Sequence, residues 1–322
     1  MDAEVVSSGA SEPRRTIRND RAGKDFFRLI CWVAAVATVG VLAWIAYSIG
    51  ENAWPAIQKF GLGFIIDVSW NPVKERFGAG SFLYGTAVSS FIALLIALPL
   101  GVAIAIFLSE NFLPVAIRQF IRFVVEMLAA IPSVVFGLWG IFTVIPLVQK
   151  YAPAVSESLG FIPIFKGPVI GNSMFTASLV LALMVLPTIT AISRTALVAV
   201  PKTLREGAYA LGSTRWEAIF GVIIPTAAPG IVAATILAFG RAMGETMAVA
   251  MLIGNSPRLE TSLFQPAGTL AGLLANQFSE ASGLQMAALM YAALLLMGIT
   301  LIVNVLGEVV LRYTQRMTLG IR

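Results

Sequence analysis

Six long apolar segments dominate this sequence and restrict the folds that it can adopt. Each is long enough to cross the roughly 30 Å hydrocarbon core of a bilayer as a helix. Charged residues make up only 12% of the chain, against about 25% in a typical soluble domain. We therefore predict an all-α, polytopic membrane protein with six transmembrane helices. The predicted spans are 27–49, 82–108, 123–148, 175–197, 227–253 and 284–310.

The segments outside these spans predict how the chain is organised. The first apolar run, of about 23 residues, is longer than the core of a signal peptide, so we read it as a retained helix. The predicted parts are an N-terminal cytoplasmic tail (1–26), a first transmembrane helix (27–49), an external loop (50–81), a transmembrane core (82–310) and a cytoplasmic C-terminal tail (311–322).

The basic residues predict the orientation of the chain. With the N-terminus inside, fifteen of the 22 Lys and Arg residues fall on the cytoplasmic side and six outside, while Arg241 lies within a span. Cytoplasmic loops carry such an excess, so both termini are expected in the cytoplasm. The net charge of +5 then reflects topology, and nucleic acid is not an expected partner.

Histidine is missing from the chain, and cysteine occurs once, as Cys31. These counts exclude histidine-based acid–base chemistry, a histidine metal site and an intramolecular disulfide. Cys31 lies in an apolar run and is expected to be a small buried hydrophobic residue. We predict neither catalytic residues nor a metal site.

Two charges interrupt the fifth apolar segment, in the stretch GRAMGETMAVAMLIG. Arg241 and Glu245 are four residues apart, so on one helix they would share a face and could pair. Charges at membrane depth face a bundle interior or a water-filled cavity, and arginine offers a fork of donors that matches oxyanions. We predict that Arg241 and Glu245 line a substrate pathway. The alternative is an ion pair that fixes helices or a partner subunit.

Three further residues are weaker candidates for the pathway. Glu126 lies one turn after Arg122 and could pair with it, in either a structural or a gating role. Ser133 and Thr188 each follow a proline within a span. Their hydroxyls could satisfy backbone groups that the proline frees, or they could donate to an anion.

The segment 201–225 has helical spacing interrupted by Gly212, which predicts a helix, a bend and a second helix at the membrane surface. Glycine tolerates backbone conformations that other residues resist. The spacing alone also fits an interfacial amphipathic hairpin.

The stretch EGAYALG, followed nine residues later by VIIP, resembles the EAA loop of ABC importer permeases. The residues that carry this resemblance are Glu206, Gly207, Ala208, Gly212 and Pro225. Gly207 departs from the family's alanine, and Val222 and Ile224 also depart from its pattern. The resemblance implies an ABC type I importer permease fold and a coupling helix that docks on an ATPase, with Arg205 and Glu206 solvated on the docking face.

The chain lacks a G-x-x-x-x-G-K-[ST] phosphate-binding loop, since RAGKD at 21–25 has neither the first glycine nor the hydroxyl residue. The chain is therefore expected to be a transport subunit and not an enzyme. No cofactor is expected on it, and ATP and Mg would bind a separate, dimeric ATPase subunit.

Three other stretches resemble the permeases of phosphate importers of the Pst type, and more closely their C than their A subunits. The resemblance runs from about residue 81 to the C-terminus. The stretches are FVVEMLAAIPSVVFGLWGIF, GRAMGETMAVAMLIGN and PAGTLAGLLANQFSEA.

This second resemblance implies phosphate as the substrate and places Arg241 and Glu245 at positions implicated in its passage. It also implies a bacterial cytoplasmic (inner) membrane, an A-type permease as heterodimer partner and an external phosphate-binding protein. Guanidinium chemistry alone leaves sulfate, molybdate or phosphonate open as substrates. A standalone secondary transporter or channel, with Glu126 and Glu245 carrying protons or cations, is the other alternative.

Overall fold

The structure is a computed structural model that describes residues 20–110 and 112–319. The start of the predicted N-terminal tail, with Arg14, Arg15 and Arg18, and the last three residues of the predicted C-terminal tail lie outside the described residues. The chain forms two units, residues 1–48 and 49–322, and each is described by itself.

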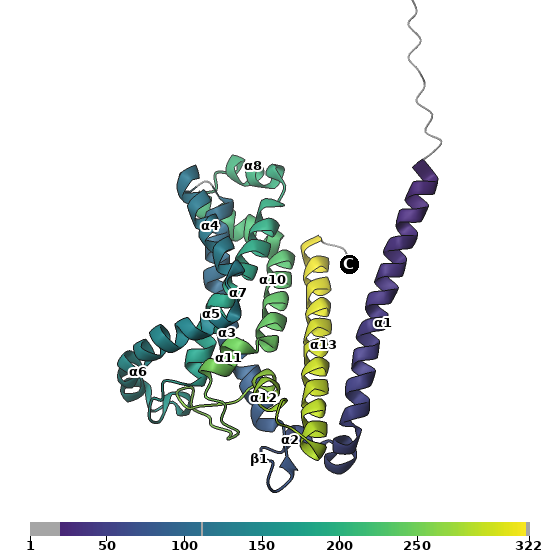
Figure 1. Cartoon of the computed structure of the whole chain (residues 1–322). Coiled ribbons are helices and arrows are strands. Elements are labelled where there is room, and N and C mark those ends of the chain that lie inside the picture. Colours follow the sequence, from purple (N-terminus) through teal and green to yellow (C-terminus); the bar gives the residue numbers. More distant parts are fainter. Residues whose placement is uncertain (1–19, 111, 320–322) are drawn as a thin grey trace, which may run out of the picture. The chain divides into compact units, whose positions relative to one another are not determined.

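Regular structure in the described residues is helical apart from one short antiparallel hairpin (Figure 1). In chain order the elements are α1 (Asp20–Phe60), α2 (Gly63–Ile66), β1 (Trp70–Asn71), β2 (Arg76–Phe77), α3 (Gly80–Ser109), α4 (Val115–Ala130), α5 (Ser133–Trp139), the π-helix η1 (Gly140–Val144), α6 (Ile145–Leu159), the 3₁₀ helix η2 (Pro163–Phe165), α7 (Met174–Val198), α8 (Lys202–Ala210), α9 (Arg215–Ala218), the π-helix η3 (Ile219–Ile223), α10 (Ile224–Gly244), α11 (Met247–Leu252), α12 (Leu270–Gln277) and α13 (Gly283–Leu319).

Six helical stretches of the described chain are long and apolar enough to cross a membrane, as predicted from the sequence. They are Phe26–Phe60, Gly80–Ser109, Ser133–Ser158, Met174–Val198, Arg215–Gly244 and Gly283–Arg316. The second, fourth and sixth agree closely with the predicted spans, the first extends further, and the third and fifth differ.

In the first unit, α1 exposes apolar side chains all around its axis, among them Trp32, Val36 and Trp44. A helix that is apolar on every face suits a lipid environment. Cys31 is exposed on this helix, so the expectation that it is buried is wrong. The reason is that the neighbouring apolar side chains point outward and build no core.

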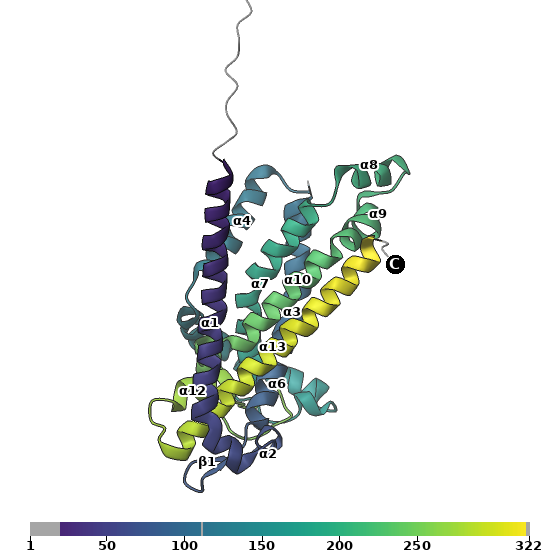
Figure 2. The same cartoon turned by 90° about the vertical axis from the view of Figure 1, so that its right-hand side faces the viewer.

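In the second unit, α7 packs against both α3 and α10, and α10 packs on α13 (Figures 1 and 2). Small residues permit the close approach that membrane helices need. Ala234, Ala238 and Ala242 of α10 are buried, and a Cβ on Gly307 of α13 would come within 2.4 Å of the Ile236 side chain.

The third predicted span, 123–148, is wrong because the backbone leaves the helix at Ile131 and Pro132. Both residues are extended, with ψ values of 127° and 145°. A proline disfavours the helical conformation of the residue before it, so α4 ends there and α5 begins at Ser133. The membrane-crossing stretch starts after this break.

The fifth predicted span, 227–253, is wrong at both ends. At its start, α9 continues through the π-helix η3 into α10, so the predicted second surface helix is part of the span. At its end, α10 stops at Gly244 and Glu245 is extended with a ψ of 126°, before α11 resumes at Met247. Irregular backbone at membrane depth is tolerated where it is buried in protein or lines an aqueous cavity.

The second unit has two distinct ends. Helix α8 lies at one end, and α2, the hairpin and α12 lie at the other (Figures 1 and 2). An aromatic cluster holds the latter end together: Phe64 stacks on Tyr291 at 4.5 Å, and Trp70 meets Phe77 edge-on at 4.9 Å between ring centroids. The Trp70 indole also donates to Gln277 of α12 at 2.9 Å.

Gly85 of α3 provides a test of this packing. A Cβ there would lie 2.0 Å from the carbonyl oxygen of Gly268, and the next residue, Thr86, accepts a hydrogen bond from the Leu270 amide at 2.9 Å. Gly85→Ala should therefore destabilise the fold by at least the roughly 1–3 kcal/mol typical of overpacking, seen as a lower melting temperature. Gly298→Ala is the matched control, since Gly298 has open space around it. Equal melting temperatures in the two variants would contradict this packing.

Candidate functional site

The structure brings together two of the predicted pathway residues, Arg241 and Thr188. The Nη1 atom of Arg241 donates to the Thr188 Oγ1 atom at 3.3 Å. Arg241 lies in the last turn of α10 and is exposed, whereas Thr188 is half-buried on α7 directly after Pro187. The partner of the guanidinium is thus a neutral hydroxyl, and no carboxylate of the described residues forms an ion pair with it.

Glu245 does not pair with Arg241, so the predicted same-face pair is wrong. Among the residues that the structure describes, the two form no ion pair. The cause is that α10 ends at Gly244, so Glu245 is not part of this helix. The two residues are four apart in the sequence, but they do not share a helix face. Glu245 is half-buried in the break between α10 and α11.

Glu126 pairs with Arg122 as its spacing predicts, with 2.7 Å between Arg122 Nε and Glu126 Oε1. Both side chains are more than half exposed. The pair belongs to α4, before the membrane-crossing stretch, and so it is not on the third span as predicted. Ser133 is half-buried at the first position of α5.

The predicted bend at Gly212 is confirmed. Gly212 has a φ of +87°, which L-residues rarely adopt. The amides of Gly212 and Ser213 donate to the carbonyls of Tyr209 and Ala208, the paired bonds of a Schellman motif that ends α8. Thr214 and Glu217 then form a capping box that starts α9.

The other residues of the EAA-like segment differ in exposure. Glu206, Gly207 and Pro225 are exposed and Ala208 is buried. The exposed Glu206 agrees with the predicted docking face, but Arg205 does not.

Arg205 is held by the ends of two other helices, so the expectation that it is solvated is wrong. Its Nη1 atom pairs with the Glu110 carboxylate directly after α3, and its Nη2 atom donates to the Leu197 carbonyl of α7 at 2.5 Å. The Arg205 and Glu110 side chains are only 19% and 14% exposed. The sequence carries no local signal for this anchor, because its ion-pair partners are 95 residues apart.

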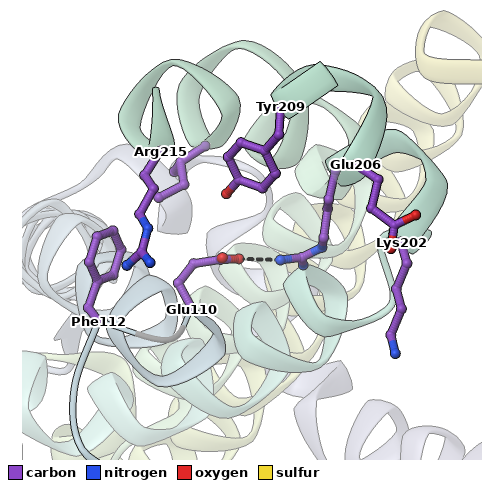
Figure 3. A pocket seen from close by; sticks show the side chains of 8 residues that line it. Glu110, Phe112, Lys202, Glu206, Tyr209 and Arg215 are labelled. Carbon is purple, nitrogen blue, oxygen red and sulfur yellow. Dashed lines mark hydrogen bonds and ion pairs between the residues drawn. The ribbon is translucent and has the colours of Figure 1, made fainter. Parts of the chain in front are cut away.

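A cavity of about 320 Å³ surrounds this anchor (Figure 3). The Glu110 carboxylate reaches towards α8, and the Arg215 guanidinium lies over the Phe112 ring, 6.0 Å from its centroid. Phe112 in turn stacks on Trp216 at 5.1 Å between centroids. These contacts fix α8 and α9 to the end of α3.

Two glycines of the EAA-like segment make a matched pair for testing the bend. Gly212→Ala should destabilise by about 1–2 kcal/mol, because the positive φ is strained for an L-residue. Gly207→Ala lies inside α8 with nothing near its added Cβ, so it should stabilise by up to about 1 kcal/mol. Melting temperatures of the purified protein should move in opposite directions, and a shared direction would count against the turn.

The described chain has six helical stretches long and apolar enough to cross a membrane, two of which adjoin a backbone break. Together with a helical loop anchored at one end, this arrangement is typical of a membrane transport protein. The chain belongs to the family of binding-protein-dependent transport system inner membrane components, which it matches over residues 97–316. This membership confirms two predictions. The chain is an importer permease, and it is a transport subunit and not an enzyme. It also makes the chain a multi-pass inner-membrane protein.

Relatives from several organisms align along most of the chain. The phosphate transport system permease protein PstC of Haemophilus influenzae is 42% identical over 91% of this chain and 94% of its own length. The PstC protein of Mesorhizobium japonicum is 40% identical over 96% of both chains. The resemblance noted in the sequence is thereby confirmed.

Solved structures support the fold. A chain of the MetNI methionine ABC transporter is similar with a TM-score of 0.51 and 19% identity, over 74% of this chain and 94% of that one. The ABC importer permease fold predicted from the EAA-like segment is therefore confirmed.

Proposed function

We propose that this chain is a permease subunit of an ATP-driven importer that moves inorganic phosphate by alternating access. The observation that carries the proposal is the exposed Arg241 guanidinium, which is hydrogen-bonded to the neutral Thr188 hydroxyl and forms no ion pair with Glu245. The relatives named as phosphate permeases narrow the oxyanion to phosphate.

Arg241 suits an oxyanion that must both bind and leave. The guanidinium stays protonated and presents several donors in a fixed fork, so a phosphate can replace water on the donors that Thr188 does not occupy. The backbone break at Glu245 fits a position beside an aqueous pathway. Glu245 follows at this break and supplies a negative charge that limits how tightly an anion is held.

Arg241 in the last turn of α10 also has a structural explanation. A cation at a helix C-terminus interacts favourably with the helix dipole, by about 0.3–1 kcal/mol. That small contribution does not require the hydrogen bond to Thr188. Glu126 and Ser133 lie on either side of the break between α4 and α5. We propose them as weaker candidates for residues that line the pathway.

The proposed partner of α8 is a dimeric ATPase that carries ATP and Mg. Glu206, Gly207, Ala208, Gly212 and Pro225 would form or shape the docking surface. The firm attachment of α8 to α3 and α7 through Arg205 supports this role, because a docking helix transmits force only if it is fixed to the membrane core.

The remaining partners follow from the same proposal. Helix α8 and both termini would lie in the cytoplasm, so that the end with α12 and the hairpin faces an external phosphate-binding protein. A second, A-type permease would complete the pathway as a heterodimer. The boundaries 1–26 and 311–322 for the cytoplasmic tails and 50–81 for the external loop belong to this proposal.

Proteoliposomes separate this proposal from a standalone transporter. The chain alone should take up no labelled phosphate, whereas the complete transporter with ATPase, second permease and binding protein should do so only with ATP. Anion uptake by the chain alone, without any ATPase, would overturn the proposal in favour of a secondary transporter or channel.

A further inference from the structure

Two cavities near the end of α3 have a lining rich in arginine. They have volumes of about 280 and 200 Å³, and both are lined by Leu108, Arg122 and Arg194. Arg118, Gln119 and Ser109 complete the polar lining of the larger cavity. Its charged lining therefore consists of three guanidinium groups, two from α4 and one from α7.

One donor atom of Arg194 lacks an acceptor among the described residues. Its Nε atom is buried and makes no hydrogen bond to any residue that the structure describes. A buried donor without a partner is unfavourable, and such groups in native structures call for an explanation such as a bound ion.

The negative charge nearby is already engaged. Glu126 lines the smaller cavity only, and its carboxylate accepts from the Arg122 Nε atom at 2.7 Å. The described lining of the larger cavity contains no carboxylate, and the one carboxylate that lines the smaller cavity is already paired with Arg122.

We propose that this cavity, which we call the α4–α7 site, binds a phosphate group. Guanidinium forks match the oxygens of a phosphate and form charge-assisted hydrogen bonds with it. The phosphate would supply the acceptor that the buried Arg194 Nε atom lacks and would place a negative charge beside the Arg118 and Arg122 guanidinium groups.

The α4–α7 site is separate from Arg241. Arg194 lies six residues beyond Thr188 on α7, which is about 9 Å along a helix axis at 1.5 Å per residue. The phosphate group has two possible sources. It belongs either to an anionic lipid, since basic pockets between membrane helices bind lipid headgroups, or to a free phosphate ion. The site rests on the geometry of α4 and α7 and stands whether or not the proposed function does.

Two binding measurements on the complete transporter test the site and distinguish the sources. Equilibrium dialysis of radiolabelled inorganic phosphate, in nanodiscs of phosphatidylcholine only, reports the free ion. Native mass spectrometry after addition of phosphatidylglycerol reports the lipid. Arg194→Gln should weaken binding at least tenfold in one of the two measurements. Arg194→Lys should retain part of the binding, because lysine keeps the positive charge but lacks the guanidinium fork.

The controls separate a binding role from a folding role. Arg316→Gln removes an exposed arginine of α13 and should leave both measurements unchanged. Arg194→Gln should not lower the melting temperature of the ligand-free complex, because the Nε atom has no acceptor to lose. Arg118→Gln tests the site from α4 and should weaken the same ligand. If transporters with Arg194→Gln or Arg118→Gln bind phosphate and phosphatidylglycerol as tightly as the unmodified transporter does, the α4–α7 site is not a phosphate site.

Discussion

Arg241→Gln is expected to lower ATP-driven phosphate uptake at least a hundredfold while the amount of assembled transporter stays the same. A hydrogen bond to a charged group contributes about 1.5–3 kcal/mol, and each 1.36 kcal/mol changes a rate tenfold. The loss of two such bonds to a phosphate is therefore enough for this effect. Assembly should survive because Arg241 is exposed and its hydrogen-bond partner among the described residues is a single hydroxyl, that of Thr188.

Two variants control for charge and for position. Arg241→Lys keeps the charge but loses the fork, so it should retain part of the uptake. Arg258→Gln removes an exposed arginine in the segment between α11 and α12 and should transport normally. Full uptake by Arg241→Gln would remove Arg241 from the pathway, and failure of that variant to assemble would show that its role is structural.

Arg205→Ala should uncouple ATP hydrolysis from uptake, with at least a tenfold loss of transport per ATP hydrolysed. Removal of one partner of a fully buried ion pair is destabilising by about 3–5 kcal/mol, and this pair, 14–19% exposed, should show a smaller effect. The loss of stability is local, because Arg205 ties α8 to Glu110 after α3 and to the Leu197 carbonyl of α7. Without the tie, movement of α8 no longer reaches these helices.

The chain contains a matched control for this pair. Arg312 and Glu308 of α13 form an ion pair at 2.8 Å with side chains 71% and 51% exposed, and exposed pairs contribute little. Arg312→Ala should therefore leave the ratio of uptake to hydrolysis unchanged. The exchange Arg205→Glu with Glu110→Arg should restore part of the coupling. Normal coupling in Arg205→Ala would show that the anchor has no part in transmission.

Local patterns in the sequence were sufficient to predict part of this architecture. The six apolar segments, the bend at Gly212 and the Arg122–Glu126 pair each depend on residues close together in the chain. Hydropathy alone could not show where the third span is interrupted, because the residues around Pro132 are as apolar as those of an intact helix. Pro132 was a usable signal for the first break.

The tertiary partners of the site residues had no local signal. Arg241 meets Thr188 across 53 residues, and Arg205 meets Glu110 across 95. Both contacts depend on how α3, α7, α8 and α10 pack. The pairing of Arg241 with Glu245 was predicted on the assumption of a continuous helix. The extended backbone at Glu245 shows that the helix is not continuous there.

Uptake of radiolabelled phosphate into proteoliposomes that contain the complete transporter tests the central claim most directly. We expect accumulation that requires ATP, is abolished by excess unlabelled phosphate and is unaffected by the same excess of sulfate, molybdate or phosphonate, each presented with the binding protein. Accumulation of phosphate without ATP, or ATP-driven uptake of one of the other oxyanions in place of phosphate, would contradict it.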